Sequence, residues 1–509
     1  MTEKTEQHTE NSLSLSDHIK ALLQIRSHHI IFYLVCAVLF FWCINSLYFN
    51  NYAIIPLTIL PPENFKSMVA QIVALKILII VFIALYKSMS QRLPIILVGS
   101  LCMVFLGQFF GFYNASYAFQ KINISTVSLL FGMSIISIII AETKFFDFLA
   151  GKLITNFGKN HFALVCVLSL SAYFFSLFIN NITTMLLMIP LTLTLTDRLK
   201  LNNVPFLVAE IIASNLGGSS TMTGDFPNIL ISTKLQVPYM LFIEYLMPIC
   251  LINLGVMLIY FYYKVDLGSK KTELNLDLNL NKGIGEIAER GIENSWALIL
   301  SIVLLLSLII LFIVSPFDPG LITLIASFIL FCFCGIKKEQ LIKKIKYADI
   351  VFFTLLFVLI GGVEASGLLK TILSGISYLA FGNVFLKCLL LMWFACLFTM
   401  FFSSGLSTIM FLPMFMSLNI GSTEHFAIWA LSLGVCAGST GALDLATTGP
   451  ITRTFSEKFY ERKNDEVRET LEQQGKLLNF INYSKIGIPL MYFHLIVSTI
   501  YVIILFLVK

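Results

Sequence analysis

The sequence predicts an all-α polytopic membrane protein with about 11 transmembrane helices and two re-entrant hairpins, arranged as two inverted repeats. The first observation is composition: of 509 residues, 57% are hydrophobic and only 12% charged, and the mean hydropathy is +0.87. The second is that the apolar runs are continuous and about 20 residues long, which fits helices and not the alternation of a β-barrel strand. The third is that distinctive residues recur at a nearly constant spacing.

Composition also narrows the function classes. The net charge of +5 requires no nucleic-acid partner, because the basic residues gather in the segments between the apolar runs. All ten cysteines fall in apolar segments and are interpreted as small buried hydrophobes. No P-loop, zinc-binding His-Glu-x-x-His or clustered acidic metal site occurs, so the chain is not expected to be an enzyme.

The N-terminal part begins with a polar cytoplasmic tail, residues 1–27, followed by the first transmembrane helix within 28–60. Residues 61–264 form the first repeat. Its amphipathic stretch from Glu142 to about Asn160 is expected to be an interfacial helix. The apolar runs long enough to cross a bilayer in this part are 28–48, 67–87, 94–113, 126–142 and 239–264.

Two features interrupt the first repeat. The run 161–197 is too long for one span and too short for two with a loop, so it predicts a re-entrant hairpin with Asn180-Asn181 at its tip. A helix at about 205–215 is then expected to break over Gly217–Gly224 and to resume towards Leu235. Irregular backbone inside a membrane is tolerated only where it lines a cavity or is buried in protein.

A polar cytoplasmic linker, residues 265–293, separates this repeat from the second, residues 294–509. The second repeat shows the same order: spans, an amphipathic piece near 365–381, a hairpin, a broken helix and a final span. Its apolar segments are 295–315, 320–336, 348–364, the hairpin 384–418 with its break at Ser403-Ser404-Gly405, the broken helix 426–450 and the span 486–508.

Three landmarks support an internal duplication. Pro190 and Pro413 follow the two hairpin tips at an offset of 413 − 190 = 223, and Gly218 and Gly438 give 438 − 218 = 220. Leu130-Phe131 recurs as Leu356-Phe357 at an offset of 356 − 130 = 226. With five crossings in each repeat, an odd number, the two repeats must be inverted relative to each other.

The basic residues predict the orientation. With a cytoplasmic N-terminus, 27 of the 34 Lys and Arg residues fall in cytoplasmic segments, five in outer segments and two within spans. This bias follows the positive-inside rule. We therefore expect a multi-pass protein of a bacterial inner (plasma) membrane, in contact with the lipid bilayer, with its N-terminus in the cytoplasm.

The interruptions carry the candidate binding residues. Unwound backbone supplies carbonyl oxygens, half-helix N-termini favour anions, and hydroxyls and amides satisfy sodium. Asp225 is the expected charge carrier, since an acid inside a membrane is a functional candidate by default; the alternative is that it only caps the resumed helix. The candidates of the first repeat are Asn180, Asn181, Thr183, Thr184, Gly217, Gly218, Ser219, Ser220, Thr221, Gly224, Asp225 and Asn228.

The second repeat offers a less polar set. Serine and threonine are also common packing residues in membrane helices, which is the alternative interpretation of this set. Its candidates are Ser403, Ser404, Ser407, Thr408, Gly438, Ser439, Thr440 and Asp444. Glu210, on the helix before the first break, is either a solvated side chain or a member of a proton relay.

Together Asn180–Pro190 and Ser214–Asn228 resemble the paired signatures of the ion-transporter superfamily. Leu129–Met133 and Glu142–Asp147 resemble its branch of arsenite permeases, NhaD-type antiporters and the P protein, which is related to citrate transporter-like proteins and divalent-anion:sodium symporters. The resemblance implies a homodimer that works by an elevator motion, with the tips and broken helices around the substrate. The chain departs from that branch in having Asn180-Asn181 where the branch has Asp-Asn.

These features predict a secondary active transporter that moves a small inorganic ion or anion. No cofactor is expected beyond sodium ions or protons as coupling ions, and the partners are a small ionic substrate and a second copy of the chain. The alternatives are a di- or tricarboxylate:cation symporter and, in another class, a channel-like conductance without coupling.

Overall fold

A computed structural model describes residues 63–88, 91–145, 160–199, 201–265, 294–315, 317–345, 347–418, 426–441, 449–461 and 478–508. The chain divides into two units, Met1–Phe65 and Lys66–Lys509, and almost all of the described residues belong to the second. Every regular element in the described ranges is a helix, which confirms the predicted all-α class. The polar tail, the first predicted span, most of the predicted interfacial helix and the 265–293 linker lie outside the described residues.

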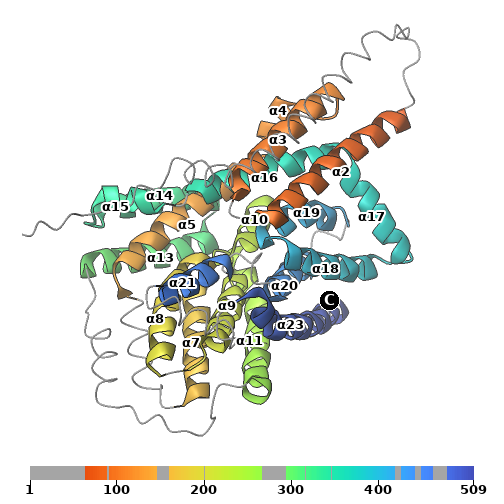
Figure 1. The fold of residues 1–509 in the computed structure, drawn as a ribbon. Helices are drawn as coiled ribbons and strands as arrows, with labels where there is room; N and C mark the ends of the chain where they lie inside the picture. Colours follow the sequence, from red (N-terminus) through yellow and green to blue (C-terminus); the bar gives the residue numbers. More distant parts are fainter. Residues whose placement is uncertain are drawn as a thin grey trace, which may run out of the picture. The chain divides into compact units, whose positions relative to one another are not determined.

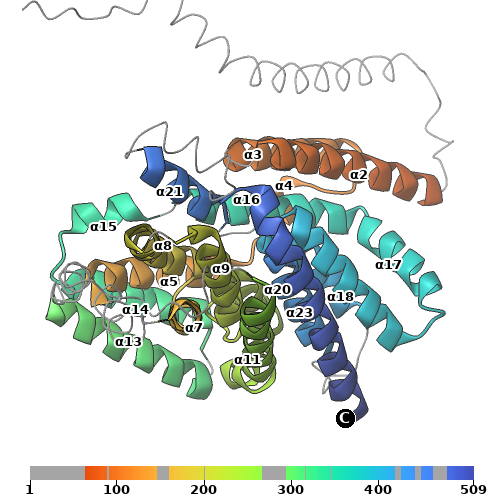
Figure 2. The ribbon, with the colours of Figure 1, turned by 60° about the horizontal axis from the view of Figure 1, so that its bottom comes forward.

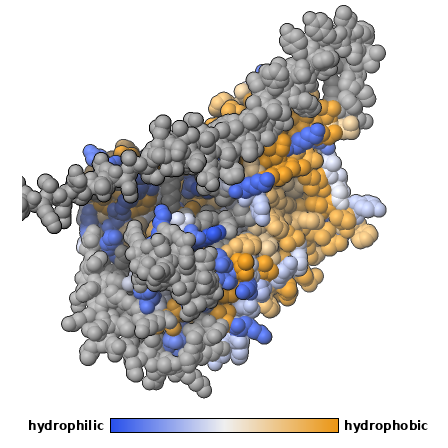
Figure 3. All heavy atoms as spheres, in the orientation of Figure 1, coloured by the Kyte–Doolittle hydropathy of each residue, from blue (hydrophilic) through white to orange (hydrophobic). Residues whose placement is uncertain are grey.

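Eight described helices are long and apolar enough to cross a membrane. Large apolar side chains on them face outward, among them Ile83, Ile299 and Ile504, each at least half exposed. Figure 3 shows such side chains covering the face on the side of α17 and α18, as a lipid-facing surface requires. The eight are α2 (Glu63–Lys87), α3 (Arg92–Phe109), α5 (Ile124–Glu142), α11 (Tyr239–Lys264), α13 (Ser295–Val314), α16 (Tyr347–Ala365), α18 (Val384–Phe401) and α23 (Phe480–Val508).

The duplication is visible in the helix boundaries. Six helices recur with their first residues 223 positions apart, as in α8 (Asn181–Arg198) and α19 (Ser404–Met416), where 404 − 181 = 223. The other five pairs are α4 (Ala115–Lys121) with α15 (Lys338–Lys344), α5 with α16, α7 (His161–Ser176) with α18, α9 (Asn203–Ser219) with α20 (Phe426–Gly441), and α10 (Phe226–Leu235) with α21 (Gly449–Glu461). The repeat is therefore a structural one and not a coincidence of single residues.

Helices of one repeat pack on helices of the other, and the corresponding helices do so reciprocally. Helix α5 packs against α14 (Pro319–Phe333), and its counterpart α16 packs against α3, as Figure 1 shows. In the same way α10 of the first repeat packs on α19 of the second, while α21 packs on α8. Reciprocal contacts of this kind are what a two-fold relation between the repeats produces.

Two ion pairs show the same exchange. Lys121 at the end of α4 lies 3.0 Å from Glu364 of α16, and Lys344 at the end of α15 lies 2.5 Å from Glu142 of α5. Lys121 and Lys344 have the same offset as the helix starts, 344 − 121 = 223. Both pairs join a short helix of one repeat to the end of a long helix of the other, so the pseudo-symmetry extends to the side chains.

The structure corrects several predicted boundaries. Helix α3 ends at Phe109, earlier than the predicted 113, because Gly111 has a positive φ of 75° and the chain turns there. Sequence reasoning missed α4, α15 and α21, which are too short or too polar to be recognised as spans. Helix α23 begins at Phe480, earlier than the predicted start at 486, and the amphipathic piece near 365–381 is α17 (Leu368–Leu379).

Candidate functional site

The first broken helix consists of α9 and α10, with the break at Ser220–Asp225. The predicted break began at Gly217, which is wrong: α9 continues through Gly217 and Gly218 to Ser219. The helix continues because these two glycines serve close packing against the neighbouring hairpin and do not form a turn. Neither they nor Gly224 has a positive φ.

The close packing is against the tip of the first hairpin. A Cβ on Gly217 would lie 2.2 Å from the Tyr173 carbonyl oxygen, and one on Gly218 would lie 2.3 Å from Asn181 Oδ1. A Cβ on Gly224 would lie 2.5 Å from the Ser176 carbonyl oxygen. The tip of the α7–α8 hairpin therefore rests directly on the break.

Asn181 is the centre of the polar contacts at this tip. Its Oδ1 accepts a 2.5 Å hydrogen bond from the Ser176 hydroxyl, and its Nδ2 donates a longer one of 3.4 Å to Asn215 Oδ1 on α9. Asn180 caps α8, because its Oδ1 accepts from the backbone N–H of Thr183 at 2.8 Å. Thr184 is fully buried on α8, and its hydroxyl has no hydrogen-bond partner in the described part of the chain.

Asp225 ends the break and begins α10. One carboxylate oxygen accepts from the Phe226 N–H at 2.9 Å, as an N-cap does. The neighbouring Gly224 packs against the Ser176 carbonyl, so the cap lies beside the polar contacts of the tip. The predicted alternatives for Asp225, cap and charged site residue, are thus compatible in the structure.

Asn228 braces the break from inside α10. Its Nδ2 donates to the carbonyl oxygens of Ser219 and Thr221, both at 2.8 Å, and its Oδ1 accepts from the Ser432 hydroxyl of α20 at 2.7 Å. Both amide hydrogens are used within the protein. Asn228 therefore shapes the site by holding the broken backbone against the second repeat.

The hydroxyls of the break are also engaged. Ser220 Oγ lies 2.7 Å from the Tyr173 hydroxyl, and Thr221 Oγ1 donates to the Leu177 carbonyl at 2.8 Å. These bonds fasten the break to the hairpin. Of the predicted first-repeat residues, the structure thus brings the tip, the glycines and the whole break together in one cluster, which is buried except for the partly exposed Asn180 and Asp225.

The second repeat shares the packing but not the polarity. A Cβ on Gly438 would lie 2.3 Å from the Cys396 carbonyl oxygen, as one on Gly217 would from Tyr173, so Gly438 is the counterpart of Gly217 and the predicted pairing with Gly218 is wrong. Ser403 caps α19 through the Leu406 N–H, and Ser407 and Thr408 donate to the carbonyls of Ser403 and Ser404 in their own helix. Ser439 and Thr440 donate to α20 carbonyls, and Asp444 lies outside the described residues.

Asn215 connects the two sites. Its Nδ2 donates to the Ser439 carbonyl at 3.3 Å, and its own carbonyl accepts a 3.8 Å contact from the Cys436 thiol. Helices α9 and α20 pack against each other where these residues meet, and Figure 2 shows the two helices side by side. One amide therefore contacts the first hairpin tip and the second broken helix at once.

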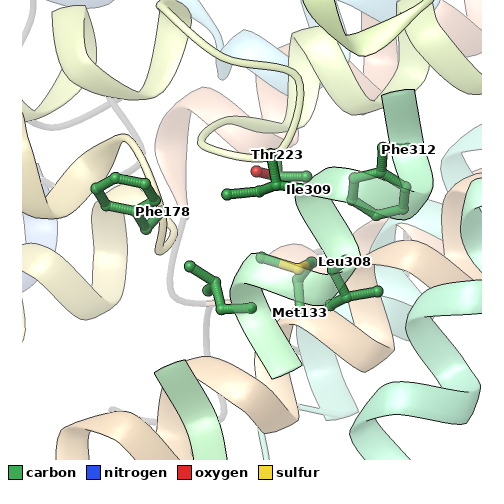
Figure 4. A pocket seen from close by; sticks show the side chains of 7 residues that line it. Met133, Phe178, Thr223, Leu308, Ile309 and Phe312 are labelled. Atoms are coloured by element: carbon green, nitrogen blue, oxygen red, sulfur yellow. The ribbon is translucent and has the colours of Figure 1, made fainter. Parts of the chain in front are cut away.

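A small cavity of about 10 Å³ adjoins the first break. In Figure 4, Phe178 of the tip and Phe312 of α13 flank it on opposite sides, with Thr223 of the break between them. Met133 of α5 and Leu308 of α13 also line it. The helices α5 and α13 thus meet the site through apolar side chains that make few directional bonds.

Four residues that shape the site were absent from the sequence-based set: Tyr173, Ser176, Asn215 and Ser432. Asn215 had a usable signal, because an amide inside an apolar run is costly unless it is bonded. The other three carry no signal in a single sequence, since serine and tyrosine are ordinary in apolar helices. No group of three or more metal-ligating side chains occurs in the described ranges.

The described part of the chain is an all-helical membrane fold in which the first hairpin tip packs on a broken helix, and the family to which the chain belongs makes it a secondary transporter of small ions or anions. The chain belongs to the citrate transporter family (CitMHS), whose match covers residues 77–434.

Individual relatives agree with this family. The chain is 31% identical over 436 residues to the magnetosome protein MamN of Magnetospirillum gryphiswaldense, a match that covers 85% of this chain and 99% of MamN. It is 36% identical over 124 residues to the mouse P protein, covering 24% of this chain and 15% of that protein. The chain is also similar to the crystal structure of the YdaH transporter of Alcanivorax borkumensis, with 13% identity and a TM-score of 0.48 over 76% of this chain and 85% of that one.

Proposed function

We propose that the chain moves a small inorganic ion or anion through the paired breaks, driven by a proton or sodium gradient. The observation that carries this proposal is the pair Asn181 and Asn215, which joins the first hairpin tip to the second broken helix. Asp225 lies in the break against which this tip packs. A bound ion at this place would touch parts of both repeats. It could therefore favour one arrangement of the repeats over another, which coupling requires.

The charge of this group indicates how a substrate would be held. Asp225 is an acid, and no lysine or arginine lies at either tip. An anionic substrate would need helix N-termini and a co-bound cation for neutralisation, whereas a cation could use Asp225 and the amide oxygens directly. This composition favours an inorganic ion or an anion accompanied by a cation.

A carboxylate:cation symporter is the second candidate. The family description names citrate, and this is the observation that favours it. A multiply charged carboxylate would demand several co-bound cations in a site that already contains Asp225. Asn228, with both amide hydrogens used, has none left for a carboxylate.

The test is transport in proteoliposomes under an imposed proton or sodium gradient, with sodium and citrate as probes. Asp225→Asn keeps the cap, because asparagine caps comparably, but removes the charge. We expect this variant to fold and to lose gradient-driven accumulation. Asp318→Asn is the matched control, since Asp318 caps α14 through the Leu321 N–H at 3.0 Å, far from the break in sequence and outside the site.

Two results would contradict the proposal. Accumulation by Asp225→Asn with unchanged pH and sodium dependence would reduce Asp225 to a cap. Dissipation of a gradient by the wild-type protein without any uphill movement of either probe would identify a channel-like conductance instead.

A further inference from the structure

We infer that Glu210 is a proton-binding group midway along a polar seam between α8 and α9, and that this seam conducts protons between the candidate site and the far end of the first hairpin. The inference deepens the proposed function and rests on it for the role of the proton in coupling. Its first support is the environment of Glu210 itself.

Glu210 is completely buried in α9. Its Oε1 accepts a short hydrogen bond from the Thr192 hydroxyl of α8, and its Oε2 has no partner in the described part of the chain. An ionised carboxylate without water, a cation or several donors is strongly disfavoured in a protein interior. The contacts of Glu210 are therefore those of a neutral acid with its proton on Oε2.

The surrounding charges do not alter this conclusion. Helix α9 packs against α7, α8, α11, α20 and α23. The charged or readily protonated side chains described on those helices are His161 on α7, Asp197 on α8, Glu244 and Lys264 on α11, and Lys485 and His494 on α23, with none on α20. None of them pairs with Glu210, whose one hydrogen bond in the described ranges is to Thr192.

The seam is set by helical spacing. Thr192 and Thr196 lie one turn apart on α8, Thr184 lies two turns before Thr192, and all three are fully buried. Helix α9 contributes Glu210 and, one turn later, Ser214, also fully buried. Since α8 and α9 pack against each other, these side chains form one stripe along the interface.

One end of the stripe joins the candidate site. Ser214 Oγ donates to Ser176 Oγ at 3.3 Å, and Ser176 donates to Asn181. The other end is Thr196, whose hydroxyl donates to the Thr192 carbonyl at 2.7 Å near the end of α8. The unpartnered hydroxyl of Thr184 is a second buried polar atom on the stripe with an unused bonding capacity, independent of Glu210.

The second repeat provides an internal comparison. At the offset of 223 that relates the helix starts, the counterpart of Thr192 is Phe415. At the offset of 221 that separates Gly217 from Gly438, the counterpart of Glu210 is Leu431. Both counterparts are buried and apolar. Apolar residues are therefore sufficient to pack these two positions. Packing alone does not explain why the first repeat has a carboxyl group at Glu210 and a hydroxyl at Thr192.

The chemistry is a proton transfer and involves no change of oxidation state. The O–H bond on Glu210 breaks as its proton passes to water admitted at one end of the seam, and a new O–H bond forms with a proton taken from the other end. The intervening threonine and serine hydroxyls pass the proton by accepting one and donating their own.

Infrared difference spectroscopy of the purified protein in lipid tests the proton on Glu210 without any substrate. We expect a carboxylic acid C=O band, shifted in D₂O, that disappears in Glu210→Gln and persists in Glu244→Gln, an exposed acid on the adjacent α11. Thr192→Val should keep the band but move it to higher frequency, because the hydroxyl that bonds to Oε1 is lost. A spectrum unchanged by Glu210→Gln would overturn the inference.

Proton flux then tests the seam. Wild-type proteoliposomes containing a trapped pH dye are given a sodium or a citrate gradient, and Glu210→Gln should lower the coupled proton flux by about tenfold or more. Exchange of the same labelled probe at equal concentrations on both sides should persist. Coupled proton flux retained by the variant would refute the conduction role. Absence of any probe flux in the wild-type protein would refute the proposed function. The infrared result would then still decide whether Glu210 carries a proton.

Discussion

Gly217→Ala tests whether the glycines of the break serve close packing. The added Cβ would lie 2.2 Å from the Tyr173 carbonyl oxygen and 2.9 Å from the carbonyl carbon. Both are backbone atoms within α7, and the Tyr173 side chain is further held by its 2.7 Å contact to Ser220. The hairpin tip must therefore shift away from the break to admit a single methyl group.

The magnitude follows from two opposing effects. Overpacking a well-packed interior costs about 1–3 kcal/mol, whereas alanine gains about 0.5–1 kcal/mol over glycine inside a helix. We expect a net loss of about 1–2 kcal/mol, and a comparable loss for Gly438→Ala, whose Cβ would lie 2.3 Å from the Cys396 carbonyl oxygen. Gly255→Ala is the control, because nothing lies within 4 Å of a Cβ at that position of α11.

The assay is the thermal unfolding midpoint of each purified variant, measured beside transport of the same preparation. The midpoints of Gly217→Ala and Gly438→Ala should fall and that of Gly255→Ala should stay or rise. If Gly217→Ala were as stable as Gly255→Ala, the tip would not pack on the break as described, and the buried cluster around Asn181 would lose its structural basis.

Other contacts give three further predictions. Asn228→Ala leaves the Ser219 and Thr221 carbonyls without the side-chain donor of Asn228, so the free energy of unfolding should fall by about 1–3 kcal/mol in a thermal unfolding assay. The control is Gln108→Ala, at an exposed position of α3, which should leave the free energy of unfolding nearly unchanged. Lys344→Ala should cost less than about 1 kcal/mol in the same assay, because Lys344 is half exposed and surface ion pairs contribute little; a larger loss would show that the pair holds the repeats together. In a Cys-free protein, a cysteine at Lys458, exposed on α21, should react with an impermeant thiol reagent only after permeabilisation, because α21 is expected on the cytoplasmic side. Labelling in intact cells would reverse the predicted orientation.

The sequence was sufficient for most of the architecture, because the signals that specify it are local. Spans are determined by the length of apolar runs, so α11 was predicted with its observed bounds of 239 and 264. The hairpins followed from amides or hydroxyls in the middle of long apolar runs, and these residues indeed cap α8 and α19. Pro227 lies in the first turn of α10, where the missing N–H and the fixed φ of proline are tolerated.

The errors have a common physical origin. Glycine in a sequence is compatible with a turn and with close helix packing, and only the neighbouring helix distinguishes them. Tyr173 and Asn181, which need the space that Gly217 and Gly218 leave, are about 40 residues away in the chain, beyond any local pattern. The same holds for Asn228, whose side-chain bond to Ser432 across the repeats could not be foreseen from its own surroundings.

The two halves of the site have diverged in chemistry while keeping their geometry. The glycine contacts with Tyr173 and Cys396 are nearly identical, so the packing of each tip on its broken helix is common to both repeats. At the spacings that relate the repeats, the positions of Asn181 and Asn215 are occupied by Ser404 and Cys436, which are shorter and less polar. Cys436 nevertheless contacts the Asn215 carbonyl, so the second repeat supports the first-repeat amide instead of forming an equal site. An ion held by Asn181, Asn215 and Asp225 would therefore lie off the pseudo-two-fold axis, with one repeat providing the ligands and the other the wall.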